Sequence, residues 1–312
     1  MRRPGRLGRV AGAVRSMGRR GRCLPAVLML AAALAGCRDA AAPVVPGPQA
    51  SLQGKSASSS AAPAAARPQR IVSLNLCADQ LVLQLADRHQ VVAVSELAHD
   101  PRMSMLAERA RGIPGVRGDA ESILRLRPDL VLVGRYTTRY TAQMLRQLGV
   151  RVVEVPLANS LHEVAIQTMV VAEAVARPER GRALVARMQQ EVQALRAARA
   201  QESATLQPVA AERSWMGYGS GTGTMFDELL QLAGYRNAAA MAGLRGYGYL
   251  PMERLVATQP DLLLTPDYGR DEPSIEFRDR LPVALAHLRL GEMVVPTRMT
   301  ICGGPWSLDV VR

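Results

Sequence analysis

The side chains that most often carry catalysis or bind metal ions are scattered along this chain. Its four histidines show no spacing typical of a metal site. Ser220 lacks the glycines two residues before and two residues after it that a hydrolase nucleophile elbow requires. The glycine-rich run 217–223 matches neither the phosphate-binding loop nor the dinucleotide fingerprint, so it indicates either close approach of the backbone to a ligand or a sharp structural turn. These patterns predict no catalytic residue and no metal site.

Aromatic residues are scarce, at 4% of the 312 residues, and several of them follow the ends of expected strands. In an open α/β lobe, the loops beyond the carboxyl ends of the strands form the ligand crevice. Rings gathered there can stack on a large planar or hydrophobic ligand. The rings expected to contact a ligand are Tyr136, Tyr218, Tyr247, Tyr268 and Trp306. Those interpreted as local packing are Tyr140, Tyr235 and Tyr249.

Polar residues are expected in the same crevice. Asn75 and Cys77 follow the first expected strand, and Arg117 and Arg298 could pair with anionic groups of a ligand. Cys302 follows the last strand-like segment, so both cysteines are expected near the crevice. A disulfide would need their Cα atoms within about 7 Å across a crevice that must open. We therefore expect two separate thiols, with a disulfide as the alternative.

Two related α/β units must position these residues. The segment 121–133 recurs as 253–265, and each copy reads as a short helix with an early glutamate, a Pro-Asp break and an apolar strand. A continuous apolar run after a breaker suits a parallel sheet that is covered on both faces. The fold class is therefore α/β, with one lobe over 70–158 and a second over 203–312, which opens on the poorly apolar strand 209–215. In the first lobe we expect strands at 71–75, 91–94, 129–133 and 151–155, and helices at 77–86, 103–109, 121–126 and 139–148.

A helical linker, 159–202, separates the two lobes. Ser160-Leu-His-Glu163 is a capping-box pattern that opens one helix. An apolar stripe then runs from Pro178 to about Ala200, and a helix of that length would span about 35 Å. We expect it to bridge the lobes and to limit hinge motion.

The amino-terminal part has the composition of an export signal. The formal net charge is +12, and residues 1–36 contribute eight arginines and no acid to it. Without these eight charges the rest of the chain has a net charge of +4, so its composition does not indicate a basic surface for nucleic acid. The apolar run 23–34 is too short to span a bilayer but suits a signal peptide, here 1–36. Leu34-Ala35-Gly36-Cys37 resembles the lipobox of bacterial lipoproteins, which implies that Cys37 is acylated and anchors the chain to a membrane. The Ala-, Pro- and Ser-rich segment 37–69 is expected to be a disordered tether.

Several motifs in order resemble one family. They are the opening segment 70–79, the two Glu-helix-Pro-Asp-strand units, the glycine run before Asp227 and the closing Cys302-Gly-Gly-Pro-Trp306. Over about residues 70–312 the chain is similar to the substrate-binding proteins of ABC importers for iron complexes and vitamin B12. The resemblance implies two Rossmann-like lobes joined by one long interlobe helix, with a ligand cleft between them.

The resemblance also implies a function. It points to a monomeric periplasmic binder, not an enzyme and without a cofactor of its own, whose ligand is a ferric siderophore, haem or a corrinoid. Its partners would be a membrane permease and the permease's cytoplasmic ATPase. A binder of a bare metal ion and a lipoprotein enzyme on the same scaffold remain as alternatives. The chain ends at Arg312, where the family's last helix usually continues, so the resemblance predicts an incompletely closed C-terminal lobe.

Glu121 and Glu253 occupy the same place in the two copies of the repeat. In the resembled family, one surface glutamate on each lobe meets arginines of the permease, and both residues match that position. They are expected to dock the permease. The alternative is that each carboxylate only stabilises the first turn of its helix, by about 0.3–1 kcal/mol.

Overall fold

The computed structural model describes residues 67–136, 139–201, 207–212, 217–267 and 290–312. Cys37 and Tyr268, two of the predicted functional residues, lie outside the described residues.

The first lobe is built on a parallel sheet of five strands in the order β3-β2-β1-β4-β5. Successive residues of β4 face opposite sides: Leu130 and Leu132 pack in one buried cluster, Val131 and Val133 in another. The sheet is thus covered on both faces, which confirms the interpretation of its apolar strands. The strands are β1 (Ile71–Ser73), β2 (Val91–Ser95), β3 (Gly115–Val116), β4 (Leu130–Gly134) and β5 (Val152–Val155).

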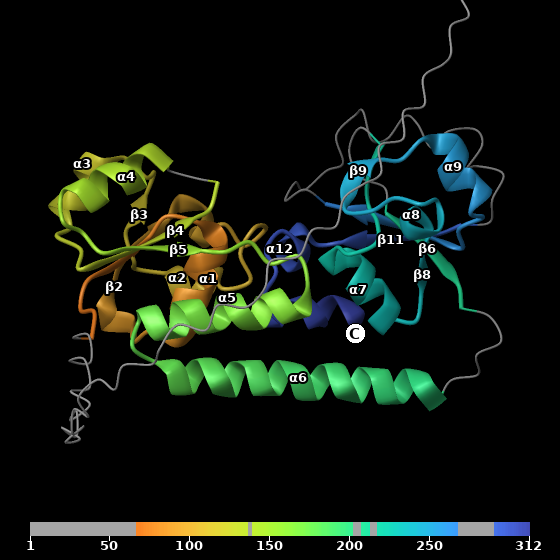
Figure 1. Ribbon diagram of the computed structural model, residues 1–312, viewed down its shortest axis with the longest axis horizontal. Helices are drawn as coiled ribbons and strands as arrows, with labels where there is room; N and C mark the ends of the chain where they lie inside the picture. Colours follow the sequence, from red (N-terminus) through yellow and green to blue (C-terminus); the bar gives the residue numbers. More distant parts are fainter. Residues whose placement is uncertain (1–66, 137–138, 202–206, 213–216, 268–289) are drawn as a thin grey trace, which may run out of the picture. The chain divides into compact units, whose positions relative to one another are not determined.

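Helices cover the two faces of this sheet (Figure 1). Residues of α1 and α5 pack on one face, and residues of α3 and α4 pack on the other. The helix expected at 103–109 is shorter, because the N–H groups of Met103 and Ser104 turn back to the carbonyl of Asp100. The helices are α1 (Leu76–Leu85), α2 (Ala107–Ala110), α3 (Ala120–Arg125), α4 (Arg139–Gln147) and α5 (Leu161–Ala174), with 3₁₀ turns at Arg88–Gln90 and Glu96–His99.

The second lobe repeats this plan with a four-stranded parallel sheet in the order β11-β10-β6-β8. Val209 and Leu263 pack with α8 and α9 on one face, and Ala210 and Leu264 pack with α7 on the other. The expected opening strand is present over 209–212. The strands are β6 (Val209–Glu212), β8 (Arg236–Asn237), β10 (Leu262–Pro266) and β11 (Gly291–Val295), and a separate antiparallel pair is formed by β7 (Tyr218–Ser220) and β9 (Tyr247–Tyr249). The helices are α7 (Met225–Leu232), α8 (Ala238–Met241), α9 (Met252–Ala257) and α12 (Thr297–Thr300), followed by the 3₁₀ segment η4 (Pro305–Val311).

The long helix α6 (Pro178–Gln201) confirms the helix expected over this stretch. It lies directly on α5, because a Cβ atom at Gly181 would come within 2.4 Å of the Cβ of Ala172. Leu184 packs against the first lobe's core, whereas Met188 and Val192 pack with residues of α7. The apolar stripe of α6 therefore contacts both lobes. Within the described ranges, no helix is both long enough and apolar enough to cross a bilayer.

The expectation of two separate thiols is wrong: Cys77 and Cys302 form a disulfide, with their Cα atoms 5.3 Å apart. The expectation sets the two residues on opposite sides of an opening crevice. Instead, the segment that carries Cys302 packs on the first lobe, where Cys302 and Trp306 join the buried cluster around Leu81. The disulfide therefore needs no contact across an opening gap.

Candidate functional site

Three exposed tyrosines stand on one face of the β7–β9 pair, which we call the tyrosine ribbon. Tyr218 lies opposite Tyr249 and Ser220 lies opposite Tyr247. Opposed residues, and residues two apart along a strand, share a face of an antiparallel pair. Tyr218, Tyr247 and Tyr249 therefore point to the same side, and they are 55%, 61% and 63% exposed.

The other face of the ribbon carries glycine and packs on the lobe. A Cβ atom at Gly248 would come within 3.0 Å of Leu244, and one at Gly221 would come within 2.2 Å of the Leu244 carbonyl oxygen. Of the two interpretations of the glycine run, close backbone approach is observed, but the partner is the chain's own backbone and side chains. These glycines let the ribbon lie flat on the lobe while its tyrosines face outward.

A buried carboxylate lies beside the ribbon at the end of β6. Hydrogen bonds from Ser220 partly offset desolvation, but burial still raises the pKa of the Glu212 carboxyl. Its Oε2 atom is buried and has no hydrogen-bond partner among the described residues. Desolvation of the phenol, together with the charges of Glu212 and Glu163, raises the pKa of Tyr247. The Tyr247 phenol therefore gives up its proton less readily than an ordinary tyrosine.

Tyr136 also stands at the carboxyl edge of a sheet. It follows β4 and is 68% exposed. The expectation that Tyr140 serves as local packing is wrong, because its ring is 90% exposed. Tyr235 does pack against the second core, and the partly exposed Tyr249 ring lies against Gly217, where a Cβ atom would come within 2.9 Å of it. Sequence reasoning did not place Tyr249 beside Tyr247, although the alternation Tyr247-Gly248-Tyr249 already indicates two rings on one face of a strand.

The predicted arginines already have partners. Arg117 Nε donates to Glu96 Oε1 at 2.8 Å, and this hydrogen bond raises the pKa of Arg117. Arg298 Nη1 donates to the carbonyl of Pro101 at 3.2 Å, which ties α12 to the first lobe. A role of either residue in binding an anionic ligand group stays a prediction.

Three other predicted ligand contacts have structural roles. The Asn75 side chain accepts the N–H groups of Cys77 and Ala78 and so begins α1. Cys77 is in the disulfide. The expectation of a crevice-lining ring at Trp306 is wrong, because Trp306 is 7% exposed and lies in the first lobe's core. Its indole folds back over Gly304, where a Cβ atom would come within 2.2 Å of the ring.

The two predicted docking residues occupy equivalent places. Glu121 is the second residue of α3 and Glu253 is the second residue of α9, and both are exposed. Arg125 donates to Glu121 at 2.6 Å. Among the described residues Glu253 has no ion-pair partner.

The part of the chain that the structure describes contains no group of three His, Cys, Asp or Glu side chains that could hold a metal ion.

Comparison with known proteins places this architecture in a family. Residues 71–278 match the family model described as "Periplasmic binding protein". The chain belongs to the periplasmic binding protein family. Membership implies an extracytoplasmic location, and a disulfide is typical of such compartments.

Solved structures of other periplasmic binding proteins share the fold. The haem-binding protein RhuT from Roseiflexus sp. RS-1 is 27% identical, with a TM-score of 0.64 over 78% of this chain and 95% of that one. The vitamin B12-binding protein BtuF of Vibrio cholerae is 22% identical, with a TM-score of 0.57 over 78% of this chain and 94% of that one. The latter likeness shows the fold alone.

A curated relative is similar over a shorter stretch. A cobalamin-binding protein from Halobacterium salinarum is 28% identical over 200 residues, which are 64% of this chain and 54% of that protein. This periplasmic binding protein therefore spans about half the length of the curated relatives it matches.

Proposed function

We propose that the chain is a lipid-anchored binding protein that captures an iron complex or a corrinoid and delivers it to an ABC importer permease. The observation that carries the proposal is the tyrosine ribbon, because three exposed rings on one face form a surface for a large planar ligand. The relatives named above bind haem and cobalamin, which are ligands of this kind.

The charge beside the ribbon favours one ligand within this group. The charges of Glu212 and Glu163 both act on Tyr247. A corrinoid carries neutral amide groups that can donate hydrogen bonds, whereas haem carries carboxylates that these glutamates would repel. We therefore expect cobalamin to bind more tightly than haem.

Titration of the mature protein with cobalamin, haem and a ferric siderophore, followed by visible absorbance, tests this proposal. Tyr218→Ala and Tyr247→Ala should each weaken binding by about tenfold, equivalent to about 1.4 kcal/mol. Tyr140→Ala is the matched control, since it removes an exposed tyrosine of α4 that lies outside the ribbon. Binding of all three variants with wild-type affinity would contradict the proposed site.

Delivery to a permease rests on Glu121 and Glu253. Charged pairs at an exposed rim mainly govern association with a partner. Replacement of both residues by arginine should therefore abolish uptake by cells and leave the dissociation constant for the ligand nearly unchanged. A large loss of ligand affinity would place these glutamates in the ligand site instead.

The anchor is tested separately through Cys37. We expect Cys37→Ser to release the protein from the membrane fraction of lysed cells. Retention of this variant in the membrane fraction would show that another feature attaches the chain.

A further inference from the structure

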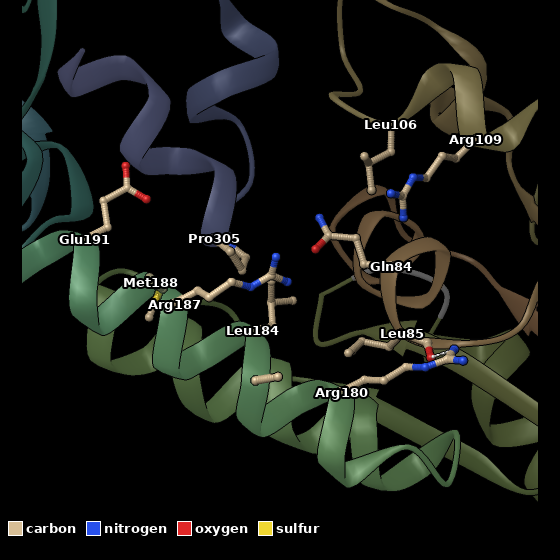
Figure 2. A pocket seen from close by; sticks show the side chains of 11 residues that line it. Gln84, Leu85, Leu106, Arg109, Arg180, Leu184, Arg187, Met188, Glu191 and Pro305 are labelled. Carbon is tan, nitrogen blue, oxygen red and sulfur yellow. Dashed lines mark hydrogen bonds between the residues drawn. The ribbon is translucent and has the colours of Figure 1, made fainter.

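A second site lies away from the tyrosine ribbon, between α6 and the helices α1 and α2 (Figure 2). It is a cavity of about 580 Å³, within the 300–1,000 Å³ range typical of small-ligand sites. None of the residues that line it belongs to the tyrosine ribbon or follows the carboxyl end of a strand. The lining residues are Gln84, Leu85, Leu106, Arg109, Arg180, Ala183, Leu184, Arg187, Met188, Glu191 and Pro305.

Positive charge dominates the polar part of this cavity. Arg180 is held by Asp87 at 2.8 Å and by the carbonyl of Leu85 at 2.9 Å. Arg109 donates only to the carbonyl of Leu83, at 3.4 Å, and Arg187 has no hydrogen bond or ion pair with any described residue.

Glu191, the one acid among the described lining residues, does not neutralise these arginines. Glu191 is already bonded to Arg312. Figure 2 shows the side chains of Arg109, Gln84 and Arg187 pointing into the same space from three helices. Two guanidinium groups without a carboxylate partner and one amide are thus available to an anion.

The rest of the wall is apolar. Leu106 and Leu184 are half-buried, Met188 is buried, and Pro305 also lines the cavity. A small inorganic anion would leave this surface in contact with water. An anion that carries an apolar chain would instead cover this surface and remove it from water, which favours binding.

We propose that this cavity binds an amphiphilic anion, one phosphate or carboxylate group on a short apolar chain. The acidic group would lie between Arg109 and Arg187, and the chain would lie against Leu184 and Met188. Either a soluble acid or a membrane lipid has this chemistry. The proposal does not depend on the cargo proposed above, because it uses none of the residues of the tyrosine ribbon.

Calorimetric titration of the full-length protein tests the proposal with three probes, each below its micelle concentration. Octyl phosphate should bind, whereas inorganic phosphate and octyl glucoside should each bind at least tenfold more weakly, because each supplies only half of the required chemistry. Arg187→Gln and Arg109→Gln should each weaken octyl phosphate binding by about tenfold or more.

Two further variants separate the cavity from general effects of charge. Arg182→Gln removes the same charge from an exposed residue of α6 that pairs with Glu179, and it should bind octyl phosphate like the wild type. Ala183→Trp fills the cavity from an exposed position without changing charge, and it should abolish binding. Equal binding of octyl glucoside and octyl phosphate, or wild-type binding by both Arg187→Gln and Ala183→Trp, would overturn the proposal.

Binding to lipid vesicles distinguishes a membrane lipid from a soluble acid as the source of the anion. Binding to phosphatidylglycerol vesicles that is lost in Arg187→Gln and absent with phosphatidylcholine would assign a lipid headgroup. Binding of octyl phosphate without binding to vesicles would assign a soluble acid. Both results support the cavity as an anion site.

Discussion

In the first lobe Asp129 accepts hydrogen bonds from the N–H groups of Gln69 and Arg70, at 2.7 and 2.9 Å, whereas in the second lobe Asp261 accepts one, from Val209, at 2.8 Å. Each aspartate stands at the start of a central strand and ties it to the start of its parallel neighbour. In both lobes the residue before the Pro-Asp pair has a φ of 47°. The repeated sequence thus produces the same local structure twice.

A second equivalent pair shows where the lobes diverge. Asp79 in α1 and Asp227 in α7 are both buried near the amino end of a helix. Asp79 is bonded to the backbone N–H and the hydroxyl of Ser95, whereas Asp227 accepts the side-chain amides of Asn237 at 3.0 Å and Gln231 at 3.1 Å. The helix position repeats, and one partner comes from the same place in each lobe, because Ser95 ends β2 and Asn237 ends β8, the strand that follows each helix. The lobes differ in the type of this residue and in the second partner, Gln231, which lies on α7 itself.

The largest difference between the two lobes is that the carboxyl-terminal segment packs on the core of the first lobe. The disulfide and Trp306 bring the carboxyl-terminal segment to the first lobe. The second core has no disulfide among its described residues. The first lobe should therefore depend on the redox state more than the second lobe does.

The largest expected effect is that of breaking this disulfide. It closes a loop of 225 residues, for which the chain-entropy model gives a stabilisation of about 5 kcal/mol. Reduction should lower the thermal midpoint of the wild type by about 10 °C. The control is the double variant Cys77→Ala/Cys302→Ala, which should already melt lower and should not respond to reductant. Equal midpoints for oxidised and reduced wild type would contradict this prediction.

The next effect concerns Asp79 and pH. Burial raises the pKa of Asp79 from 3.8 to about 7, although the hydrogen bonds from Ser95 oppose the shift. Between about pH 4 and pH 7 the folded protein therefore binds the proton that the unfolded chain has released, so stability should fall as pH rises and then level off. The total fall is on the order of 4 kcal/mol.

Asp79→Asn isolates this effect. The free energy of unfolding of the variant should not show this decrease between pH 4 and pH 7, and at pH 8 the variant should be more stable than the wild type. Urea unfolding across the pH range measures both. Ser95→Ala removes a hydrogen bond that lowers the pKa of Asp79, so the pKa of Asp79 should rise further. The decrease in stability should then continue to a higher pH than in the wild type. Parallel pH profiles for the wild type and Asp79→Asn would refute the assignment.

A smaller effect is expected at the repeated aspartates. Hydrogen bonds to a charged group contribute about 1.5–3 kcal/mol when buried, and less at these exposed positions. Asp129→Ala should cost about 1–2 kcal/mol, since two hydrogen bonds are lost, and Asp261→Ala about 1 kcal/mol, since one is lost. Chemical denaturation measures both. A larger cost for Asp261→Ala would mean that the single hydrogen bond holds the second lobe more strongly than the pair holds the first.

The smallest effect on stability is expected at the docking glutamates. Glu121→Gln and Glu253→Gln should each change the free energy of unfolding by less than about 0.5 kcal/mol, because both residues are exposed. Glu121 has Arg125 as an intrahelical partner, so its replacement should cost slightly more than that of Glu253. Thermal unfolding of the two variants side by side checks the order. A loss above 1 kcal/mol in either variant would point to a structural role.

The candidate site was only partly predictable from sequence. Tyr218 and Tyr247 were identified because they flank a glycine run and enter a helix, and the structure brings both to one face. Glu212 was missed, because nothing in the poorly apolar segment 209–215 distinguishes a buried carboxylate from an exposed one. Trp306 was placed wrongly, because its environment depends on contacts with residues more than 200 positions away.

By itself the sequence determined the α/β class, most elements of the first lobe, the long helix and the twofold repeat. These features depend on interactions within about ten residues, such as apolar alternation, the cap at Ser160 and the Pro-Asp break. Only the tertiary structure decided that Cys77 pairs with Cys302, that three tyrosines share one face, and that Arg109 and Arg187 meet around a cavity. Each of these depends on which elements become neighbours in space, and the packing of the two cores settles that.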